Sequence, residues 1–224
     1  MHKHRLTAVA AIAVATLVLP IPGQASHLPE SDAVALEILA DYYPGYWWDH
    51  TDLTIAVQAA PNVRPRYRAA VRDAIYTWDA ALREEFDDLI TLTNVTKTAR
   101  NPQKADIVLH YVPSGGGLSF SGYAICGDHR CPNILTTSDF AGQADYRAEY
   151  LGFITLHEIG HALGLGHATN LLESTDLMGY GWNEEVDPVM SRCNLDAIRY
   201  IFGWAFDGSE AQPPPENGPY VCGQ

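Results

Sequence analysis

The chain has 224 residues, 47% of them hydrophobic, which is enough apolar material for the core of one domain or of a compact two-lobed one. Its formal net charge is −13, because 27 acidic residues outnumber 14 lysines and arginines. Such an acidic surface repels phosphate groups, which argues against nucleic acids and anionic membranes as partners.

Residues 1–25 have the pattern of a signal peptide. A basic start precedes an apolar run from Leu6 to Leu19, which Pro20 ends. Small residues follow, and we predict cleavage before Ser26. The run is too short to span a bilayer comfortably. We therefore predict a secreted, extracellular mature chain without membrane contact, with an uncleaved anchor as the alternative.

Residues 26–50 are predicted to form an N-terminal extension or a short pro-segment. Ser31 is placed to cap a short helix over residues 32–39. An aromatic cluster follows at residues 42–48. We expect this cluster to pack on the main domain, and a lid is the alternative.

The main domain is predicted over residues 51–206, and its elements follow from hydrophobic periodicity. Alternating residues predict a strand over 53–57, and helical spacing after Pro65 predicts the longest amphipathic helix, over 65–82. The other expected elements are strands at 90–96, 107–112, 122–126 and 133–137, a helix from about residue 145, and a last helix over 194–202. The tail, residues 207–224, is rich in Pro and Gly and is predicted to be extended.

The helix that begins near residue 145 runs into the sequence H-E-x-x-H-x-x-G-x-x-H. His157 and His161 are four residues apart, so a helix places both imidazoles on one face, where they can bind one tetrahedral metal ion. Gly164 can take the left-handed conformation that ends a helix, and the turn then returns His167 as a third ligand. Glu158 lies beside this face, where it can contact a water molecule on the metal without being a ligand. Three histidines leave one position open, as at a single catalytic zinc ion.

Four cysteines lie after the leader, an even number that in a secreted chain suggests two disulfides. Of the three possible connectivities we favour Cys126–Cys131, which closes a tight loop, together with Cys193–Cys222, which holds the tail. A metal site built from cysteines is the competing idea, but the paired C-x-x-C spacing that it needs is missing.

The order of strand, long helix, strands, histidine helix, methionine and final helix resembles the metzincin metalloproteases. The sequence Gly-Leu-Gly-His at residues 164–167 and the helix end at Gly203 resemble the matrixins, the matrix metalloprotease type. The resemblance covers roughly residues 50–203. It implies an α+β, zincin-like fold: a mixed twisted sheet with a long packing helix and an active-site helix, followed by a small C-terminal subdomain with one helix.

The resemblance also assigns two residues that follow the third histidine. Metzincins place a methionine in a tight turn under the zinc site, and Met178 fits this position best, with Met190 as the rival. Its implied role is an apolar floor that fixes the imidazoles. In astacins and serralysins a tyrosine two residues further on reaches the zinc. Tyr180 could therefore be a fifth ligand or a hydrogen-bond donor to the oxyanion, or a plain tyrosine of the pocket wall.

Several features depart from the matrixin pattern. Ala168 stands where matrixins usually have Ser, and the connection from His167 to Met178 is longer than theirs. There is no cysteine before Cys126, so their cysteine switch is absent, and the motif for a second, structural zinc is missing. Calcium is possible given the acidity, although no loop matches an EF-hand. The subfamily therefore stays open.

The predicted function is a secreted zinc-dependent endopeptidase that acts as a monomer on protein or peptide substrates. Zinc lowers the pKa of its bound water and polarises the scissile carbonyl, and Glu158 is the general base that passes the proton to the leaving amine. We expect an extended substrate to pair with residues 134–137 as a free sheet edge. The alternatives are a catalytically silent zinc-containing binding or adhesion module, and a zinc amidase acting on cell-wall crosslinks.

Overall fold

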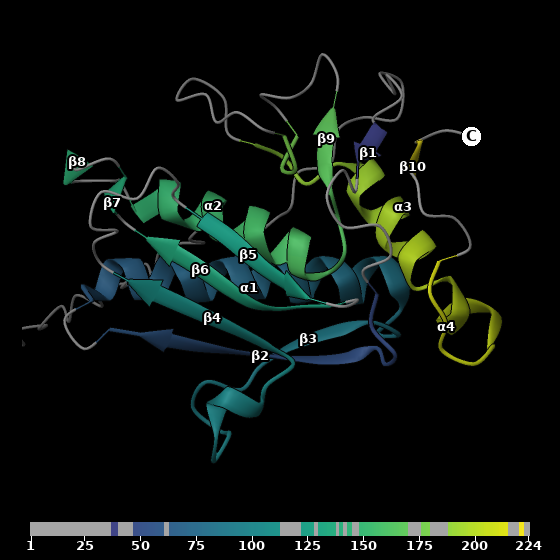
Figure 1. The fold of residues 1–224 in the computed structure, drawn as a ribbon, viewed down its shortest axis with the longest axis horizontal. Coiled ribbons are helices and arrows are strands. Elements are labelled where there is room, and N and C mark those ends of the chain that lie inside the picture. Colours follow the sequence, from purple (N-terminus) through teal and green to yellow (C-terminus); the bar gives the residue numbers. More distant parts are fainter. Residues whose placement is uncertain are drawn as a thin grey trace, which may run out of the picture.

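A computed structural model of the protein describes residues 37–39, 47–60, 63–112, 122–127, 130–137, 139–140, 143–144, 148–169, 176–179, 188–214 and 220–221 (Figure 1). The predicted signal peptide and most of the predicted extension lie outside these residues. No helix within these ranges combines the length and the apolar character that crossing a membrane requires.

A five-stranded sheet forms the centre of the fold, in the order β3-β2-β4-β6-β5. Its strands are β2 (Asp52–Ala59), β3 (Thr91–Asn94), β4 (Ile107–Val112), β5 (Gly122–Gly127) and β6 (Arg130–Thr137). The pairs β2–β3, β2–β4 and β4–β6 are parallel, whereas β5 is antiparallel to β6. The sheet is therefore mixed, as predicted.

The strand at the edge of this sheet is not the one that the sequence predicted. β6, which contains residues 134–137, has β4 on one side and β5 on the other, so its backbone groups are already paired. The prediction of a free edge there is wrong. β5 is the terminal strand on that side of the sheet (Figure 1), because the chain turns back at the end of β5 and β6 fills the inner position.

The long packing helix is α1 (Pro65–Phe86), and it confirms the predicted helix and extends it by four residues. Pro65 starts the helix, where a missing backbone N–H does no harm, and Asp87 ends it in the left-handed conformation. Its apolar stripe faces the sheet and is buried at Tyr67, Val71, Ala74, Ile75, Trp78, Ala81, Leu82 and Phe86. Helix α1 lies beside α2 (Ala148–Ala162) on the same face of the sheet (Figure 1).

Trp78 joins the two helices at the centre of the core. Its side chain is fully buried, and the indole Nε1–H donates to the carbonyl oxygen of Leu156 in α2 at 2.8 Å. A buried indole thus satisfies its one donor while it fills the space between the helices. This contact fixes the height of α2 along α1 one residue before the first histidine of the motif.

The C-terminal part contains α3 (Arg192–Ile201) and a short α4 (Gly203–Asp207). The prediction of one helix ending near Gly203 holds for α3, and α4 adds one turn after it. The guanidinium of Arg199 lies over the rings of Phe86 and Phe206, with 5.2 and 4.5 Å to their centroids. These cation–π contacts attach both helices to the end of α1.

A second, three-stranded sheet contains β1 (Glu37–Leu39), β9 (His167–Thr169) and β10 (Tyr220–Val221), with β1 in the middle. The helix predicted over residues 32–39 is therefore wrong at 37–39. The register places Leu39 opposite His167. Pairing with strands that are distant in sequence overrides the local helix signal here. Two short strands, β7 (Asp139–Phe140) and β8 (Gln143–Ala144), form a separate pair.

Residues 47–50, at the end of the predicted extension, lie against the main domain. Trp48 is buried, and its Nε1–H donates to the carbonyl oxygen of Ala162, the last residue of α2, at 2.9 Å. Arg130 pairs with Asp49 at 2.6 Å. The aromatic cluster thus packs on the domain at Trp48, as expected, while the domain boundaries themselves remain predictions.

Candidate metal centre

The structure brings the three histidines of the motif together. His157 and His161 project from one face of α2, and His167 begins β9. Gly164 has a φ of 106°, the left-handed conformation that the sequence predicted, and the chain reverses there. The ligand nitrogens of the three side chains all lie within 4.8 Å of one another. Within the described residues this is the single group of metal-ligand side chains so arranged.

Hydrogen bonds set the tautomer of two of these rings. The Nδ1 atom of His157 lies 2.7 Å from the carbonyl oxygen of Leu177, and that of His161 lies 2.7 Å from the carbonyl oxygen of Leu165. A carbonyl oxygen can only accept, so each Nδ1 carries the proton and donates. The lone pairs are then on the Nε2 atoms, which face each other at 3.0 Å. Two proton-free nitrogens this close can share one positively charged partner.

Burial keeps the imidazoles neutral in the metal-free site. It lowers the pKa of His157 and lowers that of His161 well below its usual value, with the neighbouring histidines adding to the effect at His161. Burial, followed by the influence of His157, lowers the pKa of His167 to about 4. Neutral imidazole is the form that binds metal, so the ligand set is ready at neutral pH. Three nitrogen donors of this kind fit a zinc ion.

Glu158 is buried beside the histidines, against the edge strand β5. Burial raises the pKa of its carboxyl to about 8, and a hydrogen bond from the backbone of Ala124 acts in the opposite direction. A Cβ atom on Gly122 would lie 2.5 Å from Oε1 of Glu158 and 2.5 Å from Cγ2 of Ile154. The carboxyl of Glu158 therefore fits only because residue 122 is a glycine. The sequence pattern did not indicate this requirement.

Met178 lies directly on the helix that carries the histidines. Its side chain is fully buried, and its sulfur touches the place where Gly160 would carry a Cβ atom. Its backbone oxygen accepts from the N–H of Ala168 at 2.7 Å, next to His167. The contact with Gly160 places Met178 against the histidine helix, and its role as the floor of the site stays a prediction. The rival, Met190, is also buried but lies outside the turn of residues 176–179.

Gly160→Ala is expected to lower the free energy of unfolding by about 1–3 kcal/mol, the usual effect of overpacking a filled core. The new methyl group would meet the Met178 side chain, with Trp78 only 3.4 Å away on the other side. Denaturant unfolding measures the change. Gly152→Ala is the matched control in the same helix, because its methyl group would lie 3.8 Å from Ala70, an ordinary contact. Better helix propensity should stabilise that variant by up to about 1 kcal/mol. Equal behaviour of the two variants would contradict the proposed packing.

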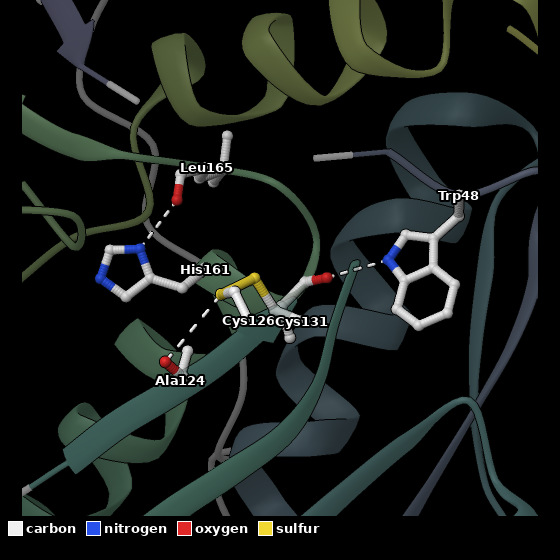
Figure 2. Close-up of a disulfide and its surroundings, with 7 residues drawn as sticks. Trp48, Ala124, Cys126, Cys131, His161 and Leu165 are labelled. Atoms are coloured by element: carbon white, nitrogen blue, oxygen red, sulfur yellow. Dashed lines mark hydrogen bonds between the residues drawn. A yellow bond between two sulfur atoms is a disulfide. The ribbon is translucent and has the colours of Figure 1, made fainter. Parts of the chain in front are cut away.

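The Cys126–Cys131 disulfide is present as predicted (Figure 2). It closes the turn between β5 and β6, and Figure 2 shows Trp48 and His161 in its surroundings. Cys193 is also disulfide-bonded. Its predicted partner, Cys222, lies outside the described residues, so that pairing remains a prediction. Tyr180 also lies outside these residues, and its role as a fifth ligand or oxyanion donor stays a prediction.

Sequence reasoning also missed a polar pair beneath the histidines. Oδ1 of Asp176 accepts hydrogen bonds from the backbone N–H of Met178 at 2.7 Å and from Nδ2 of Asn194 at 3.0 Å. Both side chains are buried. The available signal was an acidic residue two positions before the candidate methionine, but nothing in the pattern indicated that α3 supplies its partner.

Comparison with known proteins supports the resemblance found in the motif. The chain is 28% identical over 191 residues to the interstitial collagenase of Bos taurus, a stretch that covers 78% of this chain and 36% of the collagenase. The interstitial collagenases of Oryctolagus cuniculus and Sus scrofa match over the same share, at 28% and 26% identity. The chain thus spans about a third of the length of these curated relatives. No protein-family model matches it.

Among solved structures, the archaemetzincin of Methanopyrus kandleri matches 66% of this chain and 94% of its own, with a TM-score of 0.45 and 15% sequence identity. The predicted resemblance to matrixins is confirmed by the similarity to interstitial collagenases. The predicted α+β arrangement is confirmed by the mixed sheet, the long packing helix and the helix with two histidines.

Proposed function

We propose that this protein is a secreted zinc-dependent endopeptidase. One observation carries the proposal: two imidazoles with fixed Nδ1–H groups turn their Nε2 atoms toward each other, and His167 joins them. The carboxyl of Glu158, the residue after His157 in α2, is buried against β5. The similarity to interstitial collagenases supports peptide-bond hydrolysis as the reaction class. The disulfide at Cys126 supports an oxidising compartment outside the cytoplasm.

The three histidines would hold zinc through nitrogen, and Met178 would support them from below. A zinc ion bound by these three residues would supply Lewis acidity: it would lower the pKa of a water molecule toward about 7 and polarise the scissile carbonyl. Glu158 takes a proton from the attacking water and delivers it to the nitrogen of the leaving amine. The buried seat that raises the pKa of this carboxyl favours its keeping the proton between the two transfers.

The sheet edge next to the site gives the substrate a place to bind. β5 has a partner on one side only within the five-stranded sheet, and Ala124 in this strand contacts Glu158. An extended peptide can add to such an edge through main-chain hydrogen bonds. This docking brings a peptide bond next to the base, and it replaces the edge at residues 134–137 that the sequence suggested.

The test is a cleavage assay on the purified mature chain with its zinc content measured in parallel. We expect cleavage of casein or of a peptide library, loss of cleavage with a zinc chelator, and recovery when zinc is restored. A chain that holds one zinc ion per molecule and cleaves neither protein nor peptidoglycan would favour the binding module. Cleavage of peptidoglycan crosslinks alone would favour the amidase.

A further inference from the structure

The turn of residues 176–179 touches two of the three metal-binding positions. The carbonyl oxygen of Leu177 accepts the hydrogen bond from His157 at 2.7 Å. The carbonyl oxygen of Met178, the next residue, accepts from the N–H of Ala168 at 2.7 Å, immediately after His167. The position of this turn therefore determines both the ring orientation of His157 and the place where β9 starts.

The side chain of Asp176 holds the turn in shape and connects it to α3. Its Oδ1 atom accepts from the N–H of Met178 at 2.7 Å and from Nδ2 of Asn194 at 3.0 Å. Asn194 in turn belongs to the capping box of α3: its Oδ1 accepts from the N–H of Ser191 at 3.0 Å. The side-chain amide of Asn194 thus accepts a hydrogen bond from the start of α3 and donates one to the turn. A shift of the turn would therefore disturb the N-terminus of α3.

Burying the carboxyl of Asp176 in this position costs folding free energy. Asp176 is 2% exposed, and its second oxygen, Oδ2, is buried without a hydrogen-bond partner within the described structure. A buried polar atom without a partner lowers stability, so its presence in a folded protein calls for an explanation. The purpose that the contacts indicate is the precise placement of the turn under the histidines.

We propose that Asp176 and Asn194 are positioning residues that set the affinity of the three-histidine site for zinc without touching the metal. Groups that orient metal ligands from behind typically change metal affinity by 10–100-fold when they are removed. Here the effect runs from Asn194 through Asp176 to the carbonyl oxygen that orients His157. The inference rests on the zinc site of the proposed function but not on peptide hydrolysis, so a chain that binds zinc and cleaves no peptide would contradict the proposed function and leave this inference standing.

The experiment measures the zinc Kd of the metal-free full mature chain by competition with a chromogenic chelator. We expect Asn194→Ala and Asp176→Ala each to raise the Kd at least about tenfold. Ser191→Ala is the matched control, because it removes the hydroxyl that caps α3 and leaves the contact between Asn194 and Asp176 in place. This control should lower the unfolding midpoint and leave the Kd within about threefold.

An isosteric variant separates positioning from simple loss of packing. Asn194→Asp keeps the size of the side chain and an oxygen that can accept from the N–H of Ser191, but it removes the amide donor to Asp176. Its zinc Kd should therefore also rise at least about tenfold. An unchanged Kd in Asn194→Ala or in Asn194→Asp, or an equal rise in Ser191→Ala, would each overturn the proposal.

Discussion

Glu158→Gln is expected to lower kcat/KM for peptide cleavage by roughly 10²–10⁴-fold, the range that a positioned general acid–base contributes. Glutamine has the same shape as glutamate but cannot take a proton from water. The zinc Kd should stay within about threefold, because Glu158 is not among the three side chains whose ligand atoms converge. Steady-state kinetics on a library-derived peptide, with metal content measured on the same sample, checks both parts.

Glu149→Gln provides the matched control for this change. Glu149 belongs to the same helix, α2, and lies exposed in its first turn, away from the buried face. The same loss of one negative charge there should leave kcat/KM within about twofold. Retained cleavage of casein by the Glu158 variant would remove the base from the mechanism, whereas a simultaneous loss of zinc would show a structural role instead.

Features with a short-range pattern could be predicted from the sequence. The apolar stripe of α1 repeats with helical period, and Pro65 marks its start, so the helix was found almost to its end. The spacing of His157 and His161 places both rings on one helix face, and Gly164 does adopt the conformation that returns His167. In each case the side chains that decide the structure lie within one or two turns of each other.

Features that depend on distant partners could not be predicted in this way. Residues 37–39 form a strand because β9 and β10 flank them, and both partners come more than 120 residues later. The sheet edge is β5 because β6 inserts beside β4, and alternation within a strand contains no record of strand order. The contact between Asp176 and Asn194 crosses 18 residues and joins a turn to a helix cap, which no local pattern describes.

The need for a glycine at position 122 also depends on a residue distant in sequence, Glu158. We expect a substitution there to have a large effect on activity. Gly122→Ala should lower kcat/KM roughly 10²-fold, since a shift of about 1 Å at a catalytic group can cost that much. The new methyl group would lie 2.5 Å from Oε1 and 2.7 Å from Cγ of Glu158. Either the carboxyl moves away from the histidines, or β5 moves outward and the contact of Ala124 with Glu158 is lost.

Contact, not backbone strain, is the cause of this effect. Gly122 is not among the described glycines with positive φ, so an alanine can adopt its backbone conformation. Gly127→Ala is the control in the same strand, because a Cβ there meets nothing within 4 Å. It should keep kcat/KM within about twofold, and both variants should bind zinc as the parent does, since the collision involves the base and Ile154 and none of the histidines. If Gly122→Ala lost zinc together with activity, the damage would lie in the ligand set and not in the seat of Glu158. If it kept full activity, β5 would have no part in placing the base.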